Sequence, residues 1–384
     1  MKSRNFFLRR IFRRIRILIF LFIPEFAKFP KAYFNPTIPS IKNEDPVIYF
    51  LYPENLKNSA IFANTLLLLS NTYKSKILFV EEIFQKKTIN ATHVVFPIGS
   101  ELEYLKCFKL NFLYSCNSQV IFLIHDLTTF EDFLFLLRYT TKLGIFRRSQ
   151  GLIQRSYLLV HSNFAKNRLE LHVPPEHIAI IKQGVPFLNN YKFGKRASQG
   201  YTIGTGGYWN KARDLKSTIN IFALLAKMRP DCNFYVSGFL NPNQITQVLK
   251  VWQSYHLPSS QLVLLGYLEG VDFVKYLESL SLFVYLRKST SGESSGLAIE
   301  CAAAGTPFIF KNLAALDELP SEIFDGVPVG TSDEEFASFA WEIVSDQHNW
   351  HKKSLELQRF AESRSAREYA KSITKQISDW NWIE

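Results

Sequence analysis

The fold is decided by one stretch in the second half of the chain, YTIGTGGYWNKARDLKSTINIFALLAKMRPDCNFYVSGF, residues Tyr201–Phe239. It opens with a strand-like run that ends in glycines and continues into the helical pattern of Ser217–Met228. It closes on a second strand-like run, Asn233–Ser237. A strand, a helix and a strand in this order predict a βαβ unit, which is the repeating element of a doubly wound parallel sheet.

The same alternation extends in both directions from this unit. Toward the C-terminus we predict further strands and helices at Asn243–Tyr255, Gln261–Leu265, Gly270–Glu278, Leu282–Leu286, Ser295–Ala304 and Pro307–Phe310, followed by a mostly helical tail from Glu334 to Trp382. Toward the N-terminus we predict six strands, Val47–Tyr52, Lys76–Val80, His93–Phe96, Val120–Ile124, Tyr157–Val160 and Ile178–Ile181, with helices at Ala60–Ser70, Phe130–Leu143 and Asn163–Leu171. The predicted fold is α/β, with two Rossmann-like doubly wound parallel-sheet domains that face a cleft.

A length of 384 residues is sufficient for two domains of ordinary size. The polar, basic stretch Asn189–Gly200 has no periodicity and is typical of an interdomain linker. We therefore predict an N-terminal domain over residues 36–190, a linker over 191–199 and a C-terminal domain over 200–355. The helices of residues 356–384 are expected to pack back on the N-terminal domain.

The positive charge of the chain is concentrated at its N-terminus. The formal net charge is +11, but residues 1–35 hold nine Lys or Arg and one acid, while the rest of the chain holds 36 basic and 33 acidic residues. A nearly balanced body argues against nucleic acid as a partner.

The N-terminal segment, residues 1–35, has the pattern of a basic amphipathic helix. Over residues 6–23 the apolar side chains form one helical stripe, and Arg9, Arg10, Arg13 and Arg14 fall on the opposite face. The uninterrupted apolar run Ile17–Ile23 is too short to cross a bilayer. We expect this helix to lie on an anionic membrane surface, which places the protein in the cytoplasm, peripheral on the inner face of the cell membrane. A signal peptide, or a helix packed on the protein's own body, are the alternatives.

Metal and redox motifs are missing from the sequence. The four cysteines, Cys107, Cys116, Cys232 and Cys301, form no C-x-x-C pair, and the chain has no Asp-x-Asp pair. This usage favours a reducing cytoplasm and predicts no metal site.

Three segments together resemble one known family. They are LLVHSNFAKNRLELHVPPEHIAIIKQGVPF (Leu158–Phe187), the stretch Tyr201–Phe239, and KSTSGESSGLAIECAAAGTPFIF (Lys288–Phe310). In this order and spacing they resemble the retaining GT-B glycosyltransferases of family four (glycosyl transferases group 1) over residues 46–345. The resemblance implies transfer of a sugar, with retention, from a UDP- or GDP-sugar to a glycan or lipid-linked acceptor in envelope polysaccharide or glycolipid synthesis. It also implies that neither a metal nor a cofactor is needed.

The resemblance places a diphosphate clamp after the turn formed by Gly206 and Gly207, on Lys211 and Arg213. The family usually has an arginine where this chain has Gly207. The start of the predicted helix Ser295–Ala304, at Ser294, Ser295, Gly296 and Leu297, offers backbone amides and the positive end of the helix dipole to an anion. Lys211 and Arg213 as solvated charges at a helix entry are the alternative.

Glu300 follows Gly296 by about one helical turn, so its carboxylate is expected near the nucleotide ribose; an exposed helical glutamate is the alternative. The family's first glutamate lies eight positions earlier, where this chain has Gly292, and Glu293 stands one position late. Either Glu293 is moved into the donor-sugar site, or its role is lost. His125 ends a predicted strand and is a candidate for stabilising charge or orienting the acceptor, although a structural role is equally open. The loop after the first strand, YPENLKNS (Tyr52–Ser59), lacks the glycines of the family, so the acceptor is not predicted.

Two other functions are compatible with this pattern. A sugar-nucleotide epimerase of the same fold would form product from the nucleotide sugar alone. A non-catalytic glycan- or membrane-binding derivative would not turn over the donor. A dehydrogenase is disfavoured, because the glycines of Gly204–Gly207 lack the third glycine of a dinucleotide fingerprint.

Overall fold

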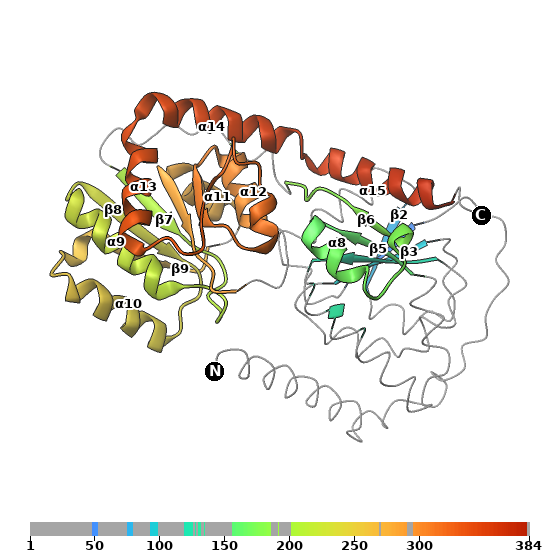
Figure 1. Ribbon diagram of the computed structural model, residues 1–384, viewed down its shortest axis with the longest axis horizontal. Coiled ribbons are helices and arrows are strands. Elements are labelled where there is room, and N and C mark those ends of the chain that lie inside the picture. The colour runs from blue at the N-terminus through green and yellow to red at the C-terminus, as the bar shows by residue number, and fades with distance from the viewer. Residues whose placement is uncertain are drawn as a thin grey trace, which may run out of the picture. The chain divides into compact units, whose positions relative to one another are not determined.

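The structure is a computed structural model that describes residues 48–52, 75–79, 93–98, 119–125, 127, 130, 131, 134, 156–185, 191, 201–268, 270–289 and 295–381 (Figure 1). The predicted N-terminal segment 1–35 and the predicted helix Ala60–Ser70 lie outside these residues, as does most of Phe130–Leu143.

The chain divides into two compact units, here termed unit 1 and unit 2. Unit 1 comprises Met1–His161, Ala165–Ile181 and Ile373–Glu384, and unit 2 comprises Ser162–Phe164 and Lys182–Ser372. The long segment of unit 2 begins at Lys182, whereas the linker composition predicted a boundary at residue 190. The backbone explains this, since the Val185 amide donates to the Arg364 carbonyl oxygen at 2.7 Å, within unit 2.

Unit 1 contains a six-stranded parallel sheet in the order β2-β1-β3-β4-β5-β6. Its described elements are β1 (Ile48–Tyr52), β2 (Ser75–Phe79), β3 (His93–Ile98), β4 (Gln119–Ile124), β5 (Tyr157–Val160), α8 (Asn163–Leu169), η4 (Pro175–His177) and β6 (Ile178–Ile180). All six strands were predicted within two residues at each end. Trp380, near the C-terminus, completes this unit: its ring packs 4.6 Å from that of Tyr157, and its Nε1 donates to the Glu176 carbonyl oxygen.

Unit 2 contains a second parallel sheet, in the order β12-β11-β10-β7-β8-β9. Its strands are β7 (Tyr201–Thr205), β8 (Cys232–Ser237), β9 (Leu262–Gly266), β10 (Leu282–Tyr285), β11 (Phe308–Lys311) and β12 (Asp325–Val327). From β7 the chain builds outward through β8 and β9, and then returns to the other side of β7 to build β10, β11 and β12. This is a Rossmann strand order. The short edge strand β12 was not predicted from the sequence.

Helices cover both faces of the second sheet (Figure 1). They and the short helical turns are α9 (Leu215–Met228), α10 (Pro242–Ser254), η6 (Ser259–Gln261), α11 (Gly270–Ser279), α12 (Gly296–Ala304), η7 (Ala314–Glu318), α13 (Asp333–Ser345) and α14 (Gln347–Glu362). The last helix, α15 (Ala366–Asn381), begins in unit 2 and ends in unit 1. One core cluster joins the sheet to α9, α10 and α13, and a second joins it to α11, α12 and α14. Along β10, Leu282 and Val284 belong to the first cluster and Phe283 and Tyr285 to the second, as the period of two requires.

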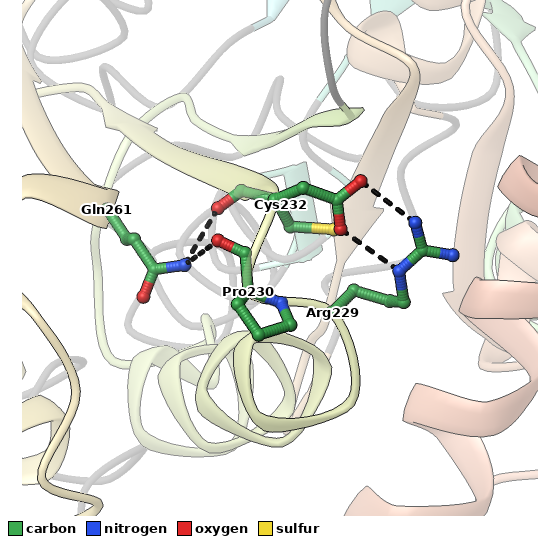
Figure 2. A network of polar contacts seen from close by, with 5 residues as sticks. Arg229, Pro230, Cys232 and Gln261 are labelled. Atoms are coloured by element: carbon green, nitrogen blue, oxygen red, sulfur yellow. Dashed lines mark hydrogen bonds and ion pairs between the residues drawn. The ribbon is translucent and has the colours of Figure 1, made fainter.

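The turn from α9 into β8 is held by polar contacts at the amino edge of the sheet (Figure 2). The Arg229 guanidinium donates to both carboxylate oxygens of Asp231, at 3.0 and 2.8 Å. The Gln261 side-chain amide donates to the carbonyl oxygens of Pro230, at 2.7 Å, and Cys232, at 3.3 Å. The Gln261 bonds satisfy backbone carbonyl groups where the helix ends. All of these contacts lie at the opposite end of the strands from the loops described next.

Candidate functional site

The candidate site lies at the carboxyl ends of β7 and β10, where the strand order of unit 2 reverses. Strands on the two sides of this point connect in opposite directions, and ligands of open α/β sheets bind at such a reversal of the strand order. The loops after the two strands are bonded to each other: the Asp214 amide donates to the Leu286 carbonyl oxygen at 3.1 Å, and the Lys288 amide to that of Ala212 at 2.7 Å. The two loops therefore form one fixed rim of the site.

Close backbone packing explains the glycines of this rim. A Cβ on Gly206 would lie 2.0 Å from Oγ of Ser237, at the end of β8. Gly238 has a φ of +107°, and a Cβ there would lie 2.1 Å from the Gly207 carbonyl oxygen. Any larger residue would push the ends of β7 and β8 apart. The glycine turn after β7 is thus in direct contact with the backbone that follows β8.

The first turn of α12 lies beside the glycine turn. A Cβ on Gly207 would meet the Leu297 side chain at 2.9 Å, and one on Gly296 would lie 3.3 Å from Nε2 of Gln183. Ser295 caps the helix, its Oγ accepting from the Ala298 amide at 3.3 Å. The first N–H groups of a helix have no acceptor within it and carry its positive dipole end, so this turn is suited to an anion.

Glu300 is buried one turn further along α12, with a residue exposure of only 7%. The alternative of an exposed helical glutamate is therefore wrong. Burial raises the pKa of its carboxyl to about 7. Tyr191 packs against the core cluster that joins the sheet to α11, α12 and α14. Burial raises the pKa of Tyr191, and the nearby Glu300 carboxylate raises it further. A buried carboxylate is costly without donors, so this position favours a ligand that supplies them.

The two predicted clamp cations have different surroundings. Lys211 is exposed in the loop between β7 and α9. Arg213 is 6% exposed, its Nη2 donates to the Gly206 carbonyl oxygen at 2.9 Å, and its guanidinium lies over the rings of Trp209 and Tyr285. The alternative of a solvated charge at the helix entry is wrong for Arg213, which is an internal support of the glycine turn.

His125 lies in unit 1, at the end of β4, beside His161 at the end of β5. His161 Nδ1 is 2.8 Å from the Ile181 carbonyl oxygen, and its Nε2 is 3.2 Å from Nδ1 of His125. A carbonyl oxygen only accepts, so His161 Nδ1 carries a proton, and in the neutral pair His125 Nδ1 donates to His161. Burial, reinforced by His161, holds the pKa of His125 well below its usual value. The pair therefore fixes one tautomer of a neutral His125.

Unit 2 thus brings together most of the predicted donor-binding residues: Gly206, Gly207, Arg213, Ser295, Gly296, Leu297 and Glu300. Glu293 and Ser294 lie outside the described residues. Three neighbours were not predicted: Gln183, Ser237 and Arg287. Two of them carried a sequence signal. Ser237 belongs to the Ser-Gly pair that ends β8, and Arg287 is a cation directly after a predicted strand.

Within the described residues, no helix is long and apolar enough to cross a membrane. Over the same residues, no group of three or more His, Cys, Asp or Glu side chains is arranged to hold a metal ion.

The chain is similar to known proteins in its structure, whereas its sequence matches neither a protein-family model nor a curated protein. Among solved structures, HepE of Anabaena in complex with UDP and glucose is similar with a TM-score of 0.66 at 13% identity, over 87% of this chain and 100% of that one. Sucrose-phosphate synthase of Thermosynechococcus elongatus gives 0.66 at 12% identity, over 88% and 100%. WaaG, a glycosyltransferase involved in lipopolysaccharide biosynthesis, gives 0.57 at 12% identity, over 85% and 98%. Together with the two parallel sheets, these likenesses show that the chain has the GT-B fold.

Proposed function

We propose that the protein is a glycosyltransferase that binds a nucleotide sugar in unit 2 and transfers the sugar to a glycan or lipid-linked acceptor, with retention, in envelope polysaccharide or glycolipid synthesis. The observation that carries the proposal is Glu300. Its carboxylate is buried on α12, one turn beyond amides suited to phosphate, and its pKa is raised by burial. The two hydroxyls of a ribose are donors at the spacing that a carboxylate accepts, so a nucleotide would satisfy this group.

The remaining parts of unit 2 fit the diphosphate of such a donor. The bond between the anomeric carbon and the phosphate oxygen breaks, and its electron pair stays on that oxygen. The acceptor hydroxyl oxygen forms the new bond to the anomeric carbon, and its proton passes to the leaving phosphate oxygen on the same face, which gives retention. Helix amides and the Lys211 cation stabilise the charge that develops. We propose that this is sufficient without a metal or cofactor.

The other two predicted catalytic residues keep their proposed roles in this scheme. His125, held as one neutral tautomer by His161, orients the acceptor hydroxyl through a ring nitrogen. For Glu293 we propose a contact with the donor sugar; the alternative is that this role is lost. UDP is the first nucleotide to test, because HepE, a structural neighbour, was solved with UDP-glucose.

Titration calorimetry with UDP and GDP tests the proposal. We expect the wild-type protein to bind one of them and Glu300→Ala to bind it about 10- to 100-fold more weakly, because hydrogen bonds to a charged group contribute about 1.5–3 kcal/mol. Glu334→Ala, on the exposed face of α13, is the matched control and should bind like wild type. If the wild-type protein binds neither nucleotide, the proposal is wrong.

Product analysis with UDP-glucose separates the alternatives. Release of UDP supports transfer. A new nucleotide sugar formed without any acceptor indicates an epimerase, and binding without turnover indicates a non-catalytic derivative.

We further propose that residues 6–23 hold the protein on the cytoplasmic face of the cell membrane. The charge pattern of the segment supports this, with arginines opposite an apolar stripe. Co-sedimentation with vesicles tests it. The full chain should bind vesicles of phosphatidylglycerol and phosphatidylcholine and lose that binding on removal of residues 1–35, whereas equal binding by both forms would contradict the proposal.

A further inference from the structure

Two arginines meet at the reversal point of unit 2, one from each loop of the rim. Arg213 follows β7 and Arg287 follows β10, and their backbones pair as an antiparallel bridge. Both guanidinium groups lie near the ring of Tyr285, with the central carbon of Arg213 at 4.0 Å and that of Arg287 at 5.8 Å from its centroid. One aromatic ring at the end of β10 therefore holds two positive charges close together.

The Arg213 side chain is committed to the protein interior. It is buried, and Nη2 donates to Gly206 while the group lies 4.8 Å from the centroid of Trp209. Its Nε is buried without a hydrogen-bond partner. Burial lowers the pKa of this guanidinium to about 10, and the Arg287 charge acts in the same direction. Arg213 is therefore a charge fixed behind the glycine turn rather than a side chain that reaches out to a ligand.

Arg287 has the more accessible position. Its side chain is half-buried, and its neighbour Lys288 is exposed and forms an ion pair with Asp214 at 3.3 Å. Over residues 206–214 and 286–288 the rim carries four cations, Lys211, Arg213, Arg287 and Lys288, and one carboxylate. Like charges held close together repel one another until an anion neutralises them, so the rim attracts an anion of more than one charge.

We propose that Arg287 binds the diphosphate of the nucleotide, and that Arg213 is a positioning residue that holds the Gly206 turn and adds its charge from behind. This rests on the proposed function and names the group that recognises the leaving phosphate. A guanidinium offers two parallel N–H donors to phosphate oxygens, which suits a group that gains negative charge as the sugar departs. The cation comes from the loop after β10, whereas the sequence had placed the clamp wholly in the loop after β7.

The ratio of UMP to UDP dissociation constants tests this assignment, because the two nucleotides differ only in the terminal phosphate. In Arg287→Gln we expect the UDP dissociation constant to rise about 10- to 100-fold and that of UMP to change less than about threefold. The ratio of the UMP dissociation constant to the UDP dissociation constant should therefore fall. Arg229→Gln is the matched control: this arginine also stacks on aromatic rings of unit 2, at 4.3 Å from Trp341, but at the amino edge of the sheet. It should leave the ratio unchanged.

A pair of variants tests the positioning role of Arg213. Arg213→Lys keeps the charge and should keep the UMP/UDP ratio within about threefold, whereas Arg213→Gln should lower it about tenfold. Equal losses in both variants would refute the role of its charge. An unchanged ratio in Arg287→Gln, with or without a common loss of affinity, would refute Arg287 as a ligand while leaving the proposed function in place. If the wild-type protein binds GDP instead, GDP and GMP are used; if it binds no nucleotide, the proposed function and this assignment both fail.

Discussion

Glu300→Gln should stabilise the protein at alkaline pH and change little at acidic pH. The buried carboxyl has a pKa of about 7, against 4.5 for the free group. Because the folded state holds its proton more tightly than the unfolded state, folding stability falls as pH rises from 4.5 to 7, and the full loss is present above 7. At pH 8 the loss is about 3 kcal/mol, and at pH 5 it is under about 1 kcal/mol. Glutamine has the shape of the protonated form and does not ionise, so the variant avoids this loss.

Urea unfolding followed by tryptophan fluorescence measures the difference. The variant should be more stable than wild type by about 3 kcal/mol at pH 8, and the gain should shrink toward zero as pH falls through 7 to 5. On the proposed function, bound UDP should make wild type the more stable of the two at pH 8, because ribose hydroxyls would donate hydrogen bonds to the carboxylate. A gain that is the same at both pH values, or a variant that is less stable at pH 8, would refute the claim that burial raises the pKa of Glu300 in the free protein.

Three further outcomes follow from the geometry of the two units. Gly238→Ala should destabilise the protein by about 1–3 kcal/mol or more, because its Cβ would meet the Gly207 carbonyl oxygen, while Gly330→Ala, which meets nothing within 4 Å, should be nearly neutral in the same urea assay. Leu357→Ala should cost about 2–5 kcal/mol, because this fully buried side chain packs in the cluster between α12 and α14; a thermal shift no larger than that of exposed Leu249→Ala would contradict this. The ring of His125 should stay neutral from pH 8 to pH 6 because its pKa is depressed, and NMR of the ring nitrogens should show the Nδ1-protonated tautomer; titration near 6.5 would contradict the His161 contact.

Local pattern was sufficient for the six strands of unit 1 and for the longer strands and helices of unit 2. Strands of four to six residues with β-branched and aromatic side chains, separated by helical periodicity, predict a doubly wound sheet, because each strand buries both faces and each helix buries one. Glycines at strand ends also gave a correct signal, and at Gly206 and Gly238 the structure supplies the reason in the close approach of β7 and β8. The strand β12 was missed because three residues containing a glycine carry no periodicity.

The candidate site was predictable in its positions and not in its environments. The spacing of Gly296 and Glu300 puts both near the start of one helix, and that follows from 3.6 residues per turn alone. The sequence by itself therefore determined the α/β class, the Rossmann alternation and the helix that carries the carboxylate. Only the tertiary structure decided that Glu300 is buried and that Arg213 supports the glycine turn from inside. It also decided that Arg287, from the loop after β10, pairs with Arg213. The physical reason is that burial and charge proximity come from contacts between residues distant in the chain, to which local periodicity is blind.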